Sequence, residues 1–313
     1  MRPAPAGALG AVAAVGRGPQ ARATVCAVVV THNRKALLRE CLQALASQTR
    51  PADEIIVVDN ASTDGSPDLV REEFPGASLV VLPENRGGAG GFHEGMRVAH
   101  ERGSEWLWLL DDDTIATPTA LELLLESLGR LDGLPAPVLM ASKVVWTDER
   151  LHPKNLPWVR LDERWNEAFV LAAARGLVLL RSASFVSILV HRRAIDEHGL
   201  PHRHYFIWGD DGEYTARILR EGTGFMVPDS LVHHKTAGKD SVHRERKVGQ
   251  YYYEVRNKLF MLRGHSWERR EKVALAMSMT MGLWQFLRST HFSPASLRVI
   301  ARAVRDGLRE PAE

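Results

Sequence analysis

Residues Trp106–Thr114, WLWLLDDDT, place five apolar residues directly before three consecutive aspartates. An unbroken apolar run is typical of a strand buried on both faces, as in a parallel sheet covered by helices. Ligands of such sheets bind beyond the carboxyl ends of the strands, where these aspartates fall. Adjacent carboxylates repel one another in a low-dielectric cleft unless a cation neutralises them. The segment therefore predicts a buried strand that ends at a cation site; a polar turn that only caps a helix is the alternative.

The chain around this segment alternates β-branched runs with helical patterns, which predicts βα units on a largely parallel sheet. Strands are expected at 24–30, 54–59, 78–82 and 105–110. Helices are expected at 35–47, 90–103 and 117–129. In the last of these, Thr117 has the position of an N-cap and Pro118 that of the first helical residue. Beyond Gly133 the pattern loosens, and we place a second lobe there on the same sheet.

Composition limits the classes of protein. The 40 basic and 38 acidic residues give a formal charge of +2, so we expect no nucleic-acid partner. The two cysteines, Cys26 and Cys41, lie in apolar patterns, which favours free thiols in the cytoplasm. Residues 1–22, rich in Ala, Gly and Pro, predict a disordered tail. The nearest candidate for a membrane-spanning helix, Val273–Leu287, is too short to cross a bilayer.

Further polar residues extend the predicted site. Asp59 ends the second expected strand and should face the same crevice as Asp111. In an extended chain Asp111 and Asp113 share one face, and their hard oxygen ligands suit Mg²⁺ or Mn²⁺. His233 and His234 follow a strand-like run, VPDSLVHH, and each is a candidate to complete such a metal site.

Two other segments leave alternatives open. In WGDDGEY, Asp210 and Glu213 fit a helix-capping pattern, which leaves Asp211 to accept a proton from an attacking alcohol. The glycines of NRGGAGGF (85–92) resemble a phosphate-binding turn. A dinucleotide-binding fingerprint follows the first strand, however, and this run follows the third, which argues against an oxidoreductase. We expect the glycines to permit close backbone approach to a ligand or to form a flexible loop.

Six segments, taken together and in order, resemble the inverting glycosyltransferases of family 2 with the GT-A fold: VVVTHNR, IIVVDNASTDGS, NRGGAGGF, LLDDDT, WGDDGEY and YYYEVRN. The resemblance runs from about Val25 to about Leu262. It implies a Rossmann-like, mostly parallel sheet flanked by helices, with a nucleotide-binding half at 23–132 and an acceptor half at 133–262. A helical C-terminal region, 263–313, then follows. The motifs are most similar to those of bacterial galactofuranosyl- and rhamnosyltransferases of cell-wall glycan synthesis.

The resemblance also implies roles for individual residues. Asp211 matches the catalytic base, and the adjacent Asp210 is the alternative. Asp113 and His234 match the metal ligands, with His233 as the alternative for the histidine. The positions that contact the donor fall on Thr31, Asp59, Asn85, Arg86, Asp111, Asp112 and Arg256.

The activity implied is transfer of a sugar from a nucleotide donor with the help of Mn²⁺ or Mg²⁺. UDP-galactofuranose is the favoured donor, dTDP-rhamnose the second choice, and a polyprenyl-linked cell-wall glycan the acceptor. A catalytically silent module that only binds a nucleotide sugar or glycan would not require every one of these charged positions. A sugar nucleotidyltransferase would carry a glycine-rich basic loop after the first strand, and THNRKAL lacks the glycines.

The last helical pattern bears on location. Ser293 has the position of its N-cap, and arginines recur along one face, whereas the other face is apolar. The arginines are Arg298, Arg302, Arg305 and Arg309, and the apolar residues are Leu297, Ile300, Ala301, Val304 and Leu308. A basic amphipathic helix favours an anionic membrane surface, here the inner face of the cell membrane. A helix packed on the body with its arginines in water is the alternative.

Overall fold

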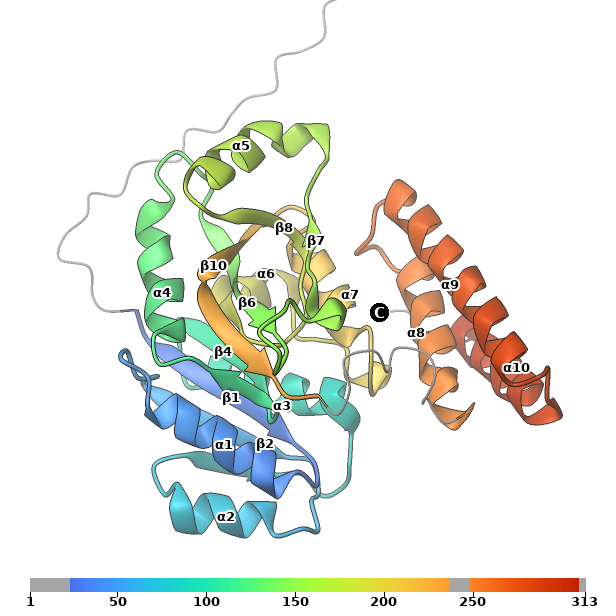
Figure 1. The fold of residues 1–313 in the computed structure, drawn as a ribbon, viewed down its shortest axis with the longest axis horizontal. Helices are drawn as coiled ribbons and strands as arrows, with labels where there is room; N and C mark the ends of the chain where they lie inside the picture. The colour runs from blue at the N-terminus through green and yellow to red at the C-terminus, as the bar shows by residue number, and fades with distance from the viewer. Residues whose placement is uncertain (1–22, 237–247, 310–313) are drawn as a thin grey trace, which may run out of the picture.

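The computed structural model describes residues 23–236 and 248–309, so the tail predicted at 1–22 lies outside the described residues. One mixed sheet forms the centre of the molecule (Figure 1), with strand order β3-β2-β1-β4-β9-β6-β10-β8-β7 and β5 paired to β10. The strands are β1 Val25–Thr31, β2 Glu54–Asp59, β3 Ser78–Val81, β4 Trp106–Asp111, β5 Thr114–Ala116, β6 Pro137–Val145, β7 Trp158–Val159, β8 Val178–Ser182, β9 Ile188–His191 and β10 Thr223–His234. The helices are α1 Lys35–Ala46, α2 Ser66–Glu73, α3 Gly87–Glu101, α4 Ala120–Glu126, α5 Asn166–Ala174, α6 Arg192–His198, α7 Asp210–Ile218, α8 Tyr251–Arg263, α9 Arg269–Ser289 and α10 Pro294–Arg309.

The first four predicted strands are confirmed as a parallel group, in which β1 pairs with β2 and β4, and β2 with β3. All seven residues of β1 are buried, as expected for a strand covered by helices on both faces. The sheet then becomes mixed, because β9 runs antiparallel to both β4 and β6. The sheet thus continues without a break from the parallel group into the second lobe, as the sequence predicts.

The glycine run is helical and is not a flexible loop, because α3 already begins at Gly87. A Cβ on Gly91 would lie 2.4 Å from Val30 Cγ1, and one on Gly95 would lie 2.4 Å from Val28 Cγ1. A Cβ on Gly87, which has φ +69°, would lie 1.9 Å from the carbonyl oxygen of Phe206. The glycines therefore let α3 pack closely against the sheet and the loop before α7. Of the two alternatives, the flexible loop was wrong, and close backbone approach to a ligand stays a prediction.

Two predicted helix starts are also wrong. Helix α4 begins at Ala120 and not at Pro118, because the backbone N–H and the Oγ1 of Thr117 both donate to the Leu231 carbonyl of β10. These bonds keep residue 117 with the sheet. At α7 the N-cap is Gly209, with φ +83°, and Asp210 is the first helical residue without a side-chain capping bond. The capping role predicted for Asp210 is therefore not seen.

The last three helices form a layer at one side of the sheet, with α8 against α9 and α10 (Figure 1). Within residues 23–236 and 248–309, no helix has both the length and the hydropathy to cross a membrane. Helix α10 packs on α8 through its small residues Ser296, Ala303 and Gly307; a Cβ on Gly307 would lie 2.8 Å from Leu259 Cδ1. Of the apolar row predicted to face a membrane, Leu297, Val304 and Leu308 are exposed, whereas Ile300 packs in part against the cluster that includes Tyr251 and Val255.

Candidate functional site

The carboxyl end of β4 brings two of the predicted aspartates together with a histidine. Asp111, Asp113 and His234 each offer a ligand atom, and these atoms all lie within 4.8 Å of one another. Strand pairing explains the arrangement: β10 runs antiparallel to β5 with His234 opposite Thr114, and the Lys235 N–H donates to the Asp113 carbonyl. His234 Nε2 therefore lies 2.9 Å from Asp113 Oδ1.

The structure distinguishes between the two candidate histidines. Successive side chains of a strand point to opposite faces, so only one of them can join the aspartates. His233 lies on the other face of β10, where its Nε2 lies 2.9 Å from Glu149 Oε1. Asn155 Oδ1 lies 2.8 Å from His234 Nδ1, and the His152 ring packs 5.0 Å from the His234 ring. Such outer contacts orient a histidine whose other nitrogen serves as a ligand.

Arg34 is a residue of the site that the sequence interpretation missed. It follows β1 in the motif VVVTHNR, and its Nη1 lies 3.1 Å from Asp112 Oδ1 and 2.8 Å from Asp113 Oδ2. Thr31 Oγ1 donates to Asp112 Oδ2 at 2.8 Å. The signal was present, because an arginine after the first strand of a parallel sheet lies at the same edge as the aspartates. Asn155 carried no such signal, because its surroundings lack any periodic pattern.

The carboxyl groups of the cluster titrate differently. Burial, with the neighbouring charge of Asp113, raises the pKa of Asp111 to about 7, and burial raises the pKa of Asp112 to about 6. Burial also opposes ionisation of Asp113, but the hydrogen bond with His234 and the charges of His234 and Arg34 together outweigh it and lower the pKa of that carboxyl. Burial lowers the pKa of His234, but the same bond and the charges of Asp113 and Asp111 together raise it. Arg34 therefore neutralises the cluster only in part, and two carboxylates with an imidazole suit a divalent cation such as Mn²⁺.

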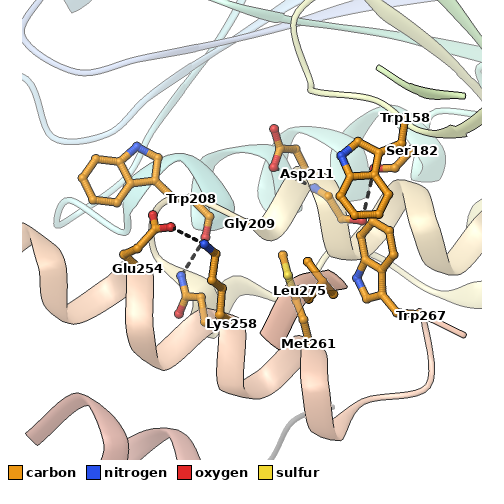
Figure 2. Close-up of a pocket in the computed structure, with 12 residues that line it drawn as sticks. Trp158, Ser182, Trp208, Gly209, Asp211, Glu254, Lys258, Met261, Trp267 and Leu275 are labelled. Carbon is orange, nitrogen blue, oxygen red and sulfur yellow. Dashed lines mark hydrogen bonds and ion pairs between the residues drawn. The ribbon is translucent and has the colours of Figure 1, made fainter. Parts of the chain in front are cut away.

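The predicted base lies in a pocket beside this cluster. Asp211 lines a cavity of about 250 Å³ between the start of α7 and helices α8 and α9 (Figure 2). Burial raises the pKa of the Asp211 carboxyl, and the Gly212 N–H donates to its Oδ1 at 2.7 Å. Asp210 is buried, and its own burial, Asp211 and Asp111 together raise its pKa. Because the charge of Asp111 contributes to this shift, the start of α7 lies within electrostatic reach of the metal-ligand cluster.

Residues 26–199 match the family model described as Glycosyl transferase family 2. The chain belongs to glycosyltransferase family 2. This glycosyltransferase is 33% identical over 204 residues to galactofuranosyltransferase GlfT1 of Mycolicibacterium smegmatis, a match that covers 64% of this chain and 67% of the relative. The corresponding GlfT1 of Mycobacterium tuberculosis is 33% identical over 210 residues, which cover 64% of this chain and 66% of the relative.

Solved structures confirm the GT-A fold. Staphylococcus aureus TarS 1–349 in complex with UDP superimposes with a TM-score of 0.61 at 16% identity, covering 91% of this chain and 80% of that one. The mannosyltransferase PcManGT from Pyrobaculum calidifontis, in complex with GDP-Man and Mn²⁺, gives a TM-score of 0.53 at 20% identity, covering 96% and 84%. The mostly parallel sheet flanked by helices is therefore the GT-A sheet.

Three of the predicted donor-binding residues, Asp59, Asn85 and Arg86, contact residues close to them in the sequence. Asp59 is fully buried; the Ser62 N–H donates to its Oδ2, and its Oδ1 has no hydrogen-bond partner within residues 23–236 and 248–309. An unpaired buried carboxylate oxygen is costly, so a ligand hydroxyl would stabilise it. Asn85 Oδ1 accepts from the Gly87 N–H, and Arg86 Nε lies 3.6 Å from Glu84 Oε1. The donor contacts of all three stay predictions.

Arg256 occupies a different place from the one expected of a diphosphate ligand. Its guanidinium is buried, donates to the carbonyls of His204 and Tyr205, and lies over the Tyr253 ring. The neighbouring Asn257 donates through Nδ2 to the carbonyls of Tyr205, Ile207 and Trp208. These bonds hold the loop that leads into α7, and the contact with a donor diphosphate stays a prediction.

That loop is strained. Phe206 and Trp208 have φ of +65° and +63°, values that non-glycine residues rarely adopt and that persist only where the surroundings enforce them. The amide of Asn257 supplies that enforcement. The strained segment places Trp208 on the wall of the pocket, and Asp211, the second residue of α7, also lines it.

Proposed function

We propose that this glycosyltransferase transfers galactofuranose from UDP-galactofuranose to a polyprenyl-linked cell-wall glycan, with inversion at the anomeric carbon. The observations that carry the reaction type are the Asp111, Asp113 and His234 cluster after β4 and the pocket that Asp211 lines. The 33% identity to the two galactofuranosyltransferases supports the choice of sugar. Transfer of rhamnose from dTDP-rhamnose is the second candidate, favoured only by the motif resemblance.

Asp113 and His234, with Asp111, would hold Mn²⁺ or Mg²⁺. A bound divalent cation supplies neutralisation of the charge that develops on a departing nucleoside diphosphate. Thr31 and Asp59 would orient the nucleoside, because both end strands of the parallel group at the edge of the sheet where the cluster lies. Asp112 is held by Arg34 and Thr31 and would contact the donor from the same edge.

Asp211 would remove the proton from the attacking acceptor hydroxyl. Its raised pKa strengthens it as a base relative to an ordinary aspartate, and it lies at the positive end of α7, which favours the ionised form needed beforehand. The acceptor oxygen would approach the anomeric carbon from the face opposite the diphosphate. Asp210 is nearly inaccessible and interacts with Asp111, which makes it the weaker candidate.

The proposal places the enzyme in the cytoplasm, in peripheral contact with the inner face of the cell membrane. The exposed apolar row of α10 and its arginines support this contact, because the helix packs on the body through a different face. A polyprenyl-linked acceptor would require it, since its lipid stays in the bilayer.

Two experiments test the proposal. Thermal unfolding with UDP, dTDP or GDP, each with and without Mn²⁺ or Mg²⁺, should show the largest rise for UDP with a metal, because a ligand that binds only the folded protein stabilises it. A rise with dTDP alone would favour rhamnose. Asp211→Asn should keep the UDP shift and lose most transfer from UDP-galactofuranose. A variant that transfers sugar at the wild-type rate would refute the assignment of the base, and a wild-type protein that binds UDP without transfer would indicate a silent binding module.

A further inference from the structure

The pocket at Asp211 has two walls of different origin. One comes from the GT-A sheet and the start of α7, and includes Trp158, Ser182 and Trp208. The other comes from α8, the α8–α9 connection and α9, and comprises Glu254, Asn257, Lys258, Met261, Trp267 and Leu275. Figure 2 shows Asp211 on the first wall, with Trp208 on one side of it and Trp158 and Trp267 on the other. The family match ends at residue 199, so the second wall is built by sequence beyond the matched region.

The lining combines aromatic faces with one charged pair. Trp158 and Trp267 meet edge to face with ring centroids 4.9 Å apart, and Trp158 is 42% exposed. Glu254 and Lys258 form an ion pair of 2.8 Å one helical turn apart, and each side chain is about one-fifth exposed (18% and 21%). Apolar walls with a few placed polar groups are typical of sites for small organic ligands.

This chemistry suits a sugar ring. A saccharide presents apolar C–H faces that pack on an indole and a rim of hydroxyls that hydrogen-bond with a carboxylate and an ammonium group. A sugar ring would cover the exposed indole of Trp158 and so remove apolar surface from water. Asp211 lines the pocket, whereas Asp111, Asp113 and His234 do not, so a sugar held there could present a hydroxyl to the Asp211 carboxylate.

We propose that this pocket is the subsite for the terminal sugar of the acceptor glycan, and that Trp158, Trp267 and the Glu254–Lys258 pair determine which acceptor is used. The proposal rests on the proposed function, because it assigns the partner of Asp211. It differs from the proposed donor site, since none of the predicted donor-binding residues lines this pocket. The C-terminal helices thus act in substrate selection as well as in packing.

The test separates acceptor recognition from donor binding. Wild-type protein, Trp158→Ala and Lys258→Met are compared in transfer from UDP-galactofuranose to two probes, octyl β-D-galactofuranoside and octyl α-L-rhamnoside. We expect the acceptor KM of both variants to rise about tenfold, as for the loss of an aromatic or charged contact of about 1.4 kcal/mol. The UDP-induced shift in Tm should persist, which also shows that the variants fold. Trp284→Ala is the matched control, because this indole lies on the outer face of α9 and is 56% exposed.

Two outcomes would overturn the proposal: an acceptor KM within twofold of wild type in both variants, or an equal rise in Trp284→Ala. Failure of the proposed function is recognised separately, through quenching of tryptophan fluorescence by the octyl glycosides without donor. Suppose that the wild-type protein transfers no galactofuranose but that the octyl glycosides quench its tryptophan fluorescence. If Trp158→Ala weakens this quenching, the result would support the saccharide subsite and contradict the proposed donor. Absence of quenching together with active transfer and unchanged KM values would place the acceptor elsewhere.

Discussion

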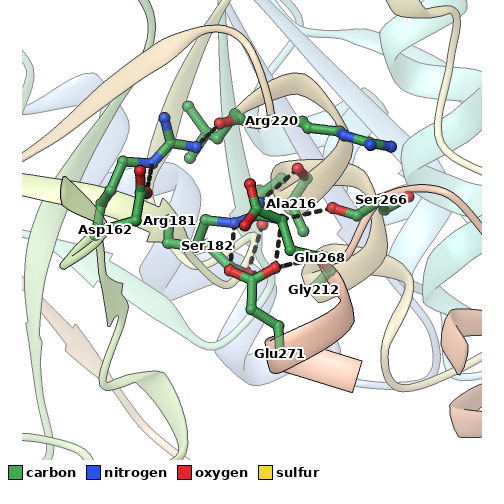
Figure 3. A network of polar contacts seen from close by, with 12 residues as sticks. Asp162, Arg181, Ser182, Gly212, Ala216, Arg220, Ser266, Glu268 and Glu271 are labelled. Atoms are coloured by element: carbon green, nitrogen blue, oxygen red, sulfur yellow. Dashed lines mark hydrogen bonds and ion pairs between the residues drawn. The ribbon is translucent and has the colours of Figure 1, made fainter. Parts of the chain in front are cut away.

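Replacing Arg181 with Met should destabilise the protein strongly, because a buried cation joins the sheet to the C-terminal helices. Arg181, on β8, is almost fully buried and donates to both carboxylate oxygens of Glu271 at 2.6 and 2.9 Å. It also donates to the carbonyls of Ala216 in α7 and Ser266 before α9 (Figure 3). The methionine removes the charge and all four bonds while keeping similar bulk.

The expected loss is about 3 kcal/mol. Removing one partner of a buried ion pair costs about 3–5 kcal/mol, because the other charge is left buried without compensation. The lower value applies here for two reasons. Glu271 retains 21% exposure, and its Oε2 still accepts from the Glu268 N–H at the start of α9, where the helix dipole favours an anion.

Urea unfolding, followed by tryptophan fluorescence and far-ultraviolet circular dichroism, measures the loss. Glu271→Gln is the matched control, because it keeps hydrogen-bonding groups while removing the carboxylate, and it should cost less than Arg181→Met. The double variant Arg181→Met with Glu271→Met should recover part of the loss, since no charge is left uncompensated. A loss below about 1 kcal/mol in Arg181→Met would refute the reasoning and show that the network adds little to the attachment of α9.

Other predictions follow from the site and the packing. Gly95→Ala should cost about 1–3 kcal/mol in urea unfolding through overpacking; wild-type stability would show that α3 can move away from the sheet. His234→Ala should abolish the Mn²⁺-dependent rise in Tm that His233→Ala keeps, and the reverse result would exchange their assignments. With a chelator present, the free energy of unfolding should fall as pH rises from 5 to 8. The pKa of Asp111 is raised in the folded protein, so the folded protein loses this proton in a pH range where the unfolded chain has already lost it. Asp111→Asn should reduce the slope of stability against pH, and an unchanged slope would contradict this assignment. The protein should float with phosphatidylglycerol vesicles, and Leu308→Asp should float less, because Leu308 is an exposed apolar residue of α10; recovery of the wild type at the bottom of the gradient would contradict membrane contact.

The parallel half of the sheet was predictable because local pattern and global position agree there. The strands are apolar on both faces, and Asp59 and Asp111 fall at their ends by a rule of topology that needs no knowledge of the loops. The cluster of Asp111, Asp113 and His234 followed from the same rule together with the resemblance. The proximity of these side chains depends on the antiparallel pairing of β5 and β10, which the sequence did not indicate, and their role as metal ligands stays a prediction.

The failures lie where tertiary contacts override local preference. NRGGAGGF carries loop-forming residues, yet the sheet accepts a helix there because the glycines remove side chains that would collide with Val28 and Val30. The buried surroundings of Arg256 were not predictable from its motif: only the fold shows that carbonyls of a strained loop accept its hydrogen bonds, and its contact with a donor diphosphate stays a prediction. The pocket beside Asp211 combines residues more than a hundred positions apart, from Trp158 to Leu275, and no short motif encodes such a set.

The spacing of α3 from the sheet has a consequence for sequence change over time. At Gly95 a methyl group would collide with Val28, so a step to alanine is costly unless a smaller residue has already replaced the valine. That prior change leaves a cavity in the core and is costly as well. Each single step is therefore unfavourable although the pair is tolerable, and a lineage that has this spacing is held in it. Homologous chains should show either the glycine with the valine or both replacements together, seldom one alone.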